Sequence, residues 1–174
     1  MEWLLTTNDG TVLEVRPITE ADRLDVEDLW RRCDKESLFR RFMSGMSTEP
    51  SALSINFLVG CDGDSRIGVA AWYEGKIVGV AHGVRVADNK CDLAALVATD
   101  WQGRGVGARL CGRIGKLADV AGMTGLVAET MQCNTAVKAM TASADAKRVK
   151  TGDFATCGFE MEFAHRQTSD PIAA

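Results

Sequence analysis

The residues best suited to chemistry lie between positions 97 and 110, where an apolar run gives way to three closely spaced glycines. Residues 102–107, with the sequence QGRGVG, follow the apolar residues 93–99 and precede apolar positions spaced three and four apart. This order predicts a buried strand, a tight turn and a helix start. Glycines let backbone N–H groups approach a ligand, and a helix start adds unpaired donors and a partial positive charge. The segment therefore predicts a phosphate-binding site.

The same strand, turn and helix also fit a dinucleotide-binding fingerprint, Gly103-x-Gly105-x-x-Ala108, with Glu129 as its acidic partner downstream. That fold repeats parallel strand and helix units, whereas here hairpin strands precede the loop and only about one more unit can follow it. A P-loop is excluded because no Gly-Lys-Ser/Thr triplet follows the glycines. The context favours a phosphate loop of another kind, and NAD binding stays as a third hypothesis.

The elements that must position this loop are predicted from apolar periodicity and turn signals. Strands are expected at 2–6, 11–16, 67–73, 77–85, 91–99 and 126–131, and helices at 20–33, 35–43, 51–59, from 105 and from 134. The Asn-Asp-Gly sequence at 8–10 predicts the first hairpin turn. A lengthened helix or an inserted loop is expected around 145–152, and a frayed tail at 168–174. Residues 1–174 are expected to form one domain.

The composition is that of an ordinary soluble protein, with 46% hydrophobic and 25% charged residues. The net charge of −4 gives no general attraction to nucleic acid or to an anionic membrane, and it suits basic partners better. The six cysteines show neither a Cys-x-x-Cys pair nor metal-ligand spacing, so reduced packing residues and no metal are expected. No leader or membrane span is recognised, which predicts a cytoplasmic protein.

The loop at 102–107 resembles the acyl-CoA pyrophosphate loop of the GNAT acetyltransferase superfamily, Gln/Arg-x-x-Gly-x-Gly/Ala after a strand. The resemblance runs from about Val12 to Phe163, and residues 16–18, 38–42 and 92–97 lean it toward bacterial protein-lysine acetyltransferases. It implies an α/β (α+β) fold with a mixed, mostly antiparallel sheet of six to seven strands flanked by about four helices. It further implies acetyl-CoA as co-substrate and direct acetyl transfer to a primary amine, either a protein lysine or a small amine. A homodimer is left open.

The resemblance also implies which residues hold acetyl-CoA. The loop amides would bind the diphosphate, and the end of the preceding strand would offer main-chain groups to the pantetheine arm. The backbone N–H near Val97 would then polarise the thioester carbonyl. Asn134 matches the asparagine that contacts pantetheine in the family, and it also suits a plain N-cap. The expected cofactor-binding residues are Leu96, Val97, Thr99, Gln102, Gly103, Arg104, Gly105, Val106, Gly107 and Asn134.

Two carboxylates are candidates for the general base. An alkyl ammonium has a pKa near 10.4, so about one molecule in a thousand is a free amine at neutral pH, and a base or a water path is needed. Asp92 occupies the position where the lysine-acetylating relatives carry a catalytic glutamate. Its side chain is one methylene shorter, which favours a relay through water. The alternative for Asp92 is a solvated carboxylate beyond a turn, and Glu129 is the reserve candidate.

The general acid of many family members, a tyrosine on the fourth helix, is missing. The position about seven residues after Asn134 is Thr141, and the only tyrosine, Tyr73, falls in a hairpin strand. A thiol with a pKa near 8.5 can leave as the thiolate, and Thr141, Ser143 or water could substitute for the acid. The missing tyrosine motivates an alternative function, a catalytically weak regulatory module that binds acetyl-CoA.

Three further residues have a possible chemical role and a plainer one. Arg40 and Arg41 could reach the cofactor or an acidic substrate group, but arginines beside a buried aromatic stripe favour a solvated helix edge. His82 could act as a base, yet its place in the middle of a strand favours a packed or surface residue.

The resemblance implies that residues 38–57 form one wall of the acceptor site and shape substrate choice.

Overall fold

The computed structural model describes residues 2–143 and 146–164, so the tail expected at 168–174 lies outside the described residues. The strands are β1 Trp3–Thr6, β2 Val12–Pro17, β3 Arg66–Tyr73, β4 Lys76–Arg85, β5 Cys91–Val97, β6 Gly125–Met131, β7 Lys147–Val149 and β8 Thr156–Glu162. The α-helices are α1 Arg23–Arg31, α2 Lys35–Phe42, α3 Ala52–Val59, α4 Val106–Val120 and α5 Thr135–Ser143. Short 3-10 turns lie at Glu20–Asp22, Ala87–Asn89 and Thr99–Trp101.

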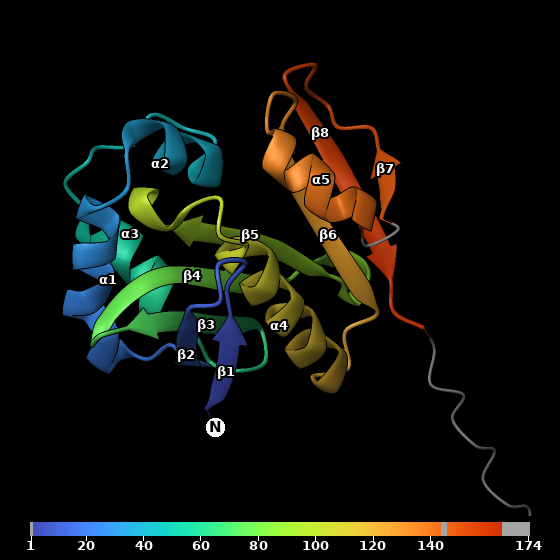
Figure 1. The fold of residues 1–174 in the computed structure, drawn as a ribbon. Helices are drawn as coiled ribbons and strands as arrows, with labels where there is room; N and C mark the ends of the chain where they lie inside the picture. The colour runs from blue at the N-terminus through green and yellow to red at the C-terminus, as the bar shows by residue number, and fades with distance from the viewer. Residues whose placement is uncertain (1, 144–145, 165–174) are drawn as a thin grey trace, which may run out of the picture.

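All eight strands form one mixed sheet in the order β1-β2-β3-β4-β5-β6-β8-β7 (Figure 1). Only the pair β5–β6 is parallel, and the other neighbours are antiparallel. The structure therefore confirms the α/β fold with a mixed, mostly antiparallel sheet. Among the described residues, the eight strands are one more than the upper number that the family resemblance implied. The five helices lie in the five ranges expected from the sequence and are one more than the resemblance implied.

The additional strand, β7, corrects the expectation of a lengthened helix or an inserted loop around 145–152. Within the described part of this segment, Lys147–Val149 pair antiparallel with Gly158–Glu160 of β8. Three residues are too few to show an alternating pattern, so periodicity could not reveal this strand. The strand exists because the edge of β8 offers unpaired backbone groups.

Helices cover both faces of the sheet. On β4, the ring of His82 meets the carbonyl oxygen of Leu58 in α3, whereas the next residue, Gly83, lies under α4. Consecutive strand residues point to opposite faces, so α3 and α4 lie on opposite sides. A Cβ at Gly83 would stand only 2.7 Å from Cγ2 of Ile114, which means that α4 packs directly on the backbone of β4. Within residues 2–143 and 146–164, no helix combines the length and apolarity needed to cross a membrane.

The start of α1 is fixed by a half-buried ion pair. Arg16 donates to the two carboxylate oxygens of Asp22 at 2.7 and 3.0 Å, and the backbone N–H of Thr19 donates to the same carboxylate at 2.8 Å. Thr19 and Asp22 thus form a capping box. Burial alone would raise the pKa of Asp22, but these hydrogen bonds outweigh it and hold the pKa below its usual value. The carboxylate is therefore ionised at neutral pH.

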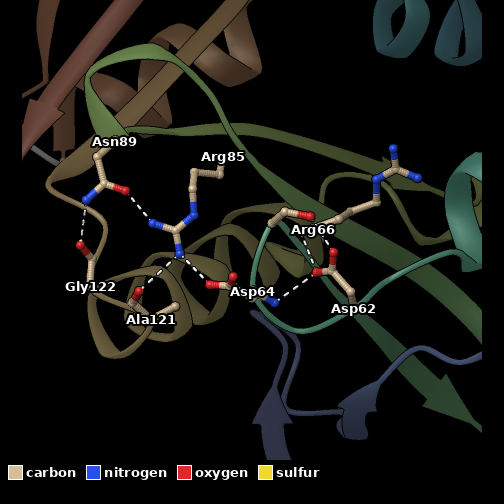
Figure 2. A network of polar contacts seen from close by, with 8 residues as sticks. Asp62, Asp64, Arg66, Arg85, Asn89, Ala121 and Gly122 are labelled. Carbon is tan, nitrogen blue, oxygen red and sulfur yellow. Dashed lines mark hydrogen bonds and ion pairs between the residues drawn. The ribbon is translucent and has the colours of Figure 1, made fainter.

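A polar network at the C-terminal end of α4 holds the start of β5 in place (Figure 2). Arg85, the last residue of β4, donates to Asp64 at 2.6 Å and to the carbonyl oxygen of Ala121 at 3.1 Å. It also donates to Asn89, whose amide donates to the carbonyl oxygen of Gly122 at 2.7 Å. The network joins the loop before β3, the turn before β5 and the end of α4.

Strands β5 and β6 are in register over only two residue pairs, Cys91 with Leu126 and Asp92 with Val127. Beyond Asp92 the two strands separate, while β5 remains paired with β4 as far as Val97. Figure 1 shows β6, β7, β8 and α5 diverging from the rest of the molecule in the direction of the α4 start. The end of β5 is therefore unpaired on the side of β6, and Asp92 marks the point where the separation begins.

Candidate active site

The glycine-rich loop begins α4 as expected. Gly103 and Gly105 have φ angles of +75° and +80°, in the left-handed region that glycine adopts without steric cost. Gly105 is the N-cap of α4, and the first helical hydrogen bond runs from the N–H of Arg109 to its carbonyl oxygen at 3.2 Å. The sequence therefore placed the turn and the helix start correctly.

The loop presents a continuous run of unpaired donors. Within the part of the chain that the structure describes, none of the backbone N–H groups of residues 103–108 donates a hydrogen bond. The positive end of the α4 dipole points the same way, so the loop favours an anion. Because the donors belong to the backbone and three of the six residues are glycines, a polyanion can lie against them.

The turn of the first hairpin holds this loop in place. The backbone N–H of Asn8 donates to the carbonyl oxygen of Arg104 at 2.9 Å, and Arg109 donates to Oδ1 of Asn8 at 2.9 Å. Nη1 of Arg104 lies 3.5 Å from Oδ2 of Asp9. Hydrogen bonds from Thr7 and Thr11 lower the pKa of Asp9 to about 2, so this partner is ionised. Arg104, expected as a cofactor contact, is paired within the protein here.

Two further residues expected at the cofactor fasten the loop to α2. The side-chain amide of Gln102 donates to the carbonyl oxygen of Val97 at 3.1 Å and to Oγ of Ser37 at 2.8 Å. Oγ1 of Thr99 accepts from the backbone N–H of Asp34, the N-cap of α2, at 3.0 Å. Their side chains therefore support the loop, while their main chain remains the part that a ligand could use.

The remaining expected cofactor residues lie along the gap between β5 and β6. Leu96 and Val106 are buried in the core, Val97 and Gly107 are half-buried, and a Cβ at Gly107 would lie 3.5 Å from Val97. The loop and the free edge of β5 are thus contiguous, as the prediction of a bound pantetheine arm requires.

Asn134 caps α5, as the plainer expectation states. Its Oδ1 accepts from the backbone N–H of Val137 at 3.3 Å, and its Nδ2 donates to Oγ1 of Thr130 at 3.0 Å. The side chain is buried and uses both ends to hold α5 against β6. A contact of Asn134 with pantetheine stays a prediction.

Of the two residues considered as substitutes for the missing acid, Thr141 is engaged within its own helix. The hydroxyl of Thr141 donates to the carbonyl oxygens of Val137 and Lys138, each at 3.0 Å. Tyr73 packs its ring 4.9 Å from the ring of Trp101, beyond the opposite end of β5 from Asp92. The side chain of Ser143 lies outside the described residues. This geometry favours departure of the thiol as thiolate.

The two predicted carboxylates meet in one cavity. A cavity of about 460 Å³ opens between α2, α3, β5 and β6, and Asp92 and Glu129 both line it. Its other lining residues are Arg41, Phe42, Met43, Leu53, Ser54, Phe57, Leu93 and Ala94. The segments 41–43 and 53–57 belong to the wall that the family resemblance implied for the acceptor.

Asp92 is the better placed of the two carboxylates to act as a base. Burial raises the pKa of this carboxyl above its ordinary value, Arg41 acts against that rise, and Glu129 adds to it. Asp92 nevertheless remains exposed to solvent, so a substrate or water can reach it. A carboxylate with a raised pKa binds a proton more strongly and is a better base. Glu129 already accepts a hydrogen bond from Thr156 at 2.6 Å.

Arg41 corrects the expectation of two solvated arginines on α2. Arg40 does lie at the exposed edge, paired with Glu36 one turn earlier, but Arg41 points into the cavity wall. Burial lowers the pKa of Arg41 to about 10, while Asp92 opposes the change. One signal in the sequence indicated this position: Arg41 stands three residues after Leu38, so the two share a helix face, and Leu38 is fully buried.

His82 is a packed residue, as expected from its place in a strand. Its Nε2 lies 2.7 Å from the carbonyl oxygen of Leu58, and the ring is 1% exposed. Burial, helped by Arg41, lowers its pKa to about 4, so the ring is neutral at physiological pH. The alternative of a general base at this position gains no support from the geometry.

Strands β5 and β6 separate beside a loop of unpaired backbone N–H groups, and a cavity with two carboxylates lies where the separation begins. This arrangement is that of the class of acyl-CoA N-acyltransferases. Residues 25–143 match the acetyltransferase (GNAT) family. The chain belongs to this family and is an enzyme of that type. Its six cysteines are free, and no cluster suited to a metal ion occurs among residues 2–143 and 146–164.

Solved structures share this fold at low sequence identity. The GNAT domain of S. lividans PAT superimposes with a TM-score of 0.87 at 23% identity, covering 93% of this chain and 97% of that one. A cAMP-binding acyltransferase from Mycobacterium smegmatis gives 0.64 at 20% identity, and the match covers 97% of this chain but 49% of that one. Salmonella typhimurium yncA, a putative acetyltransferase with its cofactor acetyl-CoA, gives 0.68 at 14% identity over 92% and 99%. No curated protein sequence matches the chain.

Proposed function

We propose that this enzyme transfers the acetyl group of acetyl-CoA directly to a primary amine in the cytoplasm, with a protein lysine as the preferred acceptor and a small amine as the second choice. The observation that carries the proposal is the run of unpaired N–H groups at residues 103–108, at the start of α4 and beside the free edge of β5. The presence of acetyl-CoA in the yncA structure and the fold shared with the GNAT domain of S. lividans PAT support it.

The donor would be held by main-chain groups. The diphosphate of acetyl-CoA would accept hydrogen bonds from the amides of residues 103–108. The pantetheine arm would lie along the edge of β5 that β6 leaves unpaired, which brings the thioester toward Val97. A backbone N–H in this region would stabilise the oxyanion that forms during transfer.

The acceptor would enter from the cavity that contains Asp92. Its ammonium group first loses a proton to Asp92, directly or through a water molecule. The free amine then attacks the thioester carbonyl, so that a C–N bond forms, and the C–S bond breaks as the nitrogen gives up its second proton to water and becomes the amide. The sulfur leaves as thiolate and takes up a proton from solvent, which needs no tyrosine because its pKa is near 8.5. No covalent intermediate on the enzyme is formed.

The test measures release of free CoA with a panel of lysine peptides and small amines. Asp92→Asn is expected to lower kcat by about a hundredfold to a thousandfold, because a positioned base contributes a factor of that order. The affinity for acetyl-CoA, measured by calorimetry, should stay unchanged. Glu129→Gln is the matched control and should lower kcat by much less. An unchanged rate in Asp92→Asn would show that the assigned role is wrong.

The second candidate function is a regulatory module that binds acetyl-CoA without turnover. It is favoured by the engagement of the Thr141 hydroxyl within its own helix, because Thr141 stands near the position of the missing tyrosine. Calorimetric binding of acetyl-CoA without thiol release over the whole amine panel would select this alternative. A rise in melting temperature with NAD and none with CoA would instead select dinucleotide binding.

A further inference from the structure

Arg41 differs from its neighbouring arginines in having no acidic partner. The arginines at both ends of α1, and Arg40 on α2, each form an ion pair with a nearby carboxylate. Arg41 makes no hydrogen bond or ion pair with any residue of 2–143 or 146–164. It stays unpaired although Asp92 and Glu129 line the same cavity.

The guanidinium group lies beside two aromatic rings. Its central carbon lies 4.9 Å from the ring centroid of Phe42 and 5.7 Å from that of Phe57. Its Nε is sealed from solvent and has no hydrogen-bond partner. The two Nη atoms also lack a protein partner, but they are not sealed. They are therefore the atoms that a molecule in the cavity can reach.

Arg41 does not serve simply as the counter-ion of Asp92. The two groups interact electrostatically across the cavity, yet no ion pair joins them, and Arg40 shows that an arginine on this helix readily forms one. The pKa of Asp92 also remains above its ordinary value in spite of Arg41. A buried charge without a partner is unfavourable, so an acceptor from outside the chain would complete this group.

We propose that Arg41 is the specificity-determining residue of the acceptor pocket and binds a carboxylate located next to the amine that is acetylated. The proposal rests on the proposed function, because it takes the cavity as the acceptor site. The planar fork of arginine matches the two oxygens of a carboxylate. Asp92 and Glu129 suit the ammonium group, and Arg41 suits the neighbouring negative charge. The acceptor class is therefore a lysine with an aspartate or glutamate beside it in a peptide.

The test compares two peptides with blocked ends, Gly-Lys-Asp-Gly and Gly-Lys-Asn-Gly, which differ only in the charge beside the lysine. The wild-type enzyme is expected to show a kcat/KM about tenfold higher for the aspartate peptide, the size of one charge-assisted hydrogen bond. Arg41→Gln should remove this preference, and Arg41→Lys should reduce it because the fork is lost. Arg40→Gln is the matched control and should leave it unchanged. A comparison of kcat/KM for free lysine and for lysinamide shows whether an α-carboxylate can supply the same charge.

A second measurement separates this inference from the proposed function. Calorimetric binding of both peptides to the CoA-bound protein does not depend on turnover, so the aspartate peptide should bind about tenfold more tightly even if no acetyl transfer occurs. Equal affinity and equal kcat/KM for the two peptides in the wild type would overturn the role of Arg41. A preference that persists in Arg41→Gln would overturn it too. A shift of the pH–rate profile in Arg41→Gln that is equal for both peptides is expected from the interaction of Arg41 with Asp92; without loss of the preference for the aspartate peptide, it would show that Arg41 acts only on Asp92.

Discussion

Replacing Gly105 with alanine should damage the loop that is proposed to bind acetyl-CoA. The residue has a φ angle of +80°, and a side chain in this region costs about 1–2 kcal/mol. The new Cβ would also lie 2.7 Å from Oδ1 of Asn8 and collide with the guanidinium of Arg109. These two side chains must then separate, with the loss of a hydrogen bond worth about 1 kcal/mol. The sum is about 2–3 kcal/mol, held in a segment whose amides must stay aligned.

The expected result is a fall in acetyl-CoA affinity of between about tenfold and a hundredfold, because the loop can relieve this strain only by moving its N–H groups. Isothermal calorimetry gives the affinity, and urea unfolding gives the change in stability. Gly122→Ala is the matched control, since Gly122 has a φ angle of +77° with open space around it, far from the loop. It should lose stability through the backbone strain alone and bind acetyl-CoA normally. Affinity of Gly105→Ala within about twofold of wild type would refute the reasoning.

Three further outcomes are expected. Asn8→Ala should weaken acetyl-CoA binding about fivefold by calorimetry, because only the bond from Arg109 is lost; an unchanged Kd would contradict the supporting role of the hairpin. Asp92→Asn should raise the free energy of unfolding at pH 7, because the folded-state pKa of Asp92 is raised. In urea titrations of the wild type, the stability that Asp92 contributes should be present below the unfolded pKa of 3.8 and lost as the pH rises through the folded pKa. Asp22→Asn should cost about 1.5 kcal/mol by weakening the hydrogen bonds from Arg16 and Thr19, because Arg16 is a third exposed. Since the folded-state pKa of Asp22 is lowered, this loss should be present above 3.8 and shrink as the pH falls through the folded pKa.

The sequence predicted those parts of the fold that short-range physics determines. The Asn-Asp-Gly hairpin formed where expected, with Gly10 at a φ angle of +87°, because a tight turn requires a residue that tolerates this conformation. The glycine loop and the start of α4 were located for the same reason. The parallel pairing of β5 and β6 followed from the helix that separates them.

Long-range contacts set the parts that were missed. Nothing in the sequence indicates that Asn8 would support the loop at Arg104, because the two residues are 96 positions apart and no alternation or periodicity relates them. Arg40 and Arg41 have identical chemistry, and the three-residue spacing of Arg41 from Leu38 is a weak signal; the packing of α2 decides that one lies in solvent and the other in the cavity wall. The convergence of Asp92 and Glu129 was likewise fixed by the sheet order.

The short register between β5 and β6 has a consequence for motion. The C-terminal strands join the rest of the sheet through two residue pairs and through the ion pairs of Lys90 with Glu160 and Glu162 on β8. Local opening should therefore be easiest across this junction, and its amide hydrogens should exchange with deuterium sooner than those of β3 and β4. A ligand that fills the gap would restrain both sides at once. A ligand present at a hundred times its Kd would add about 2.7 kcal/mol to the apparent stability. The melting temperature would therefore depend on the concentration of the acyl donor.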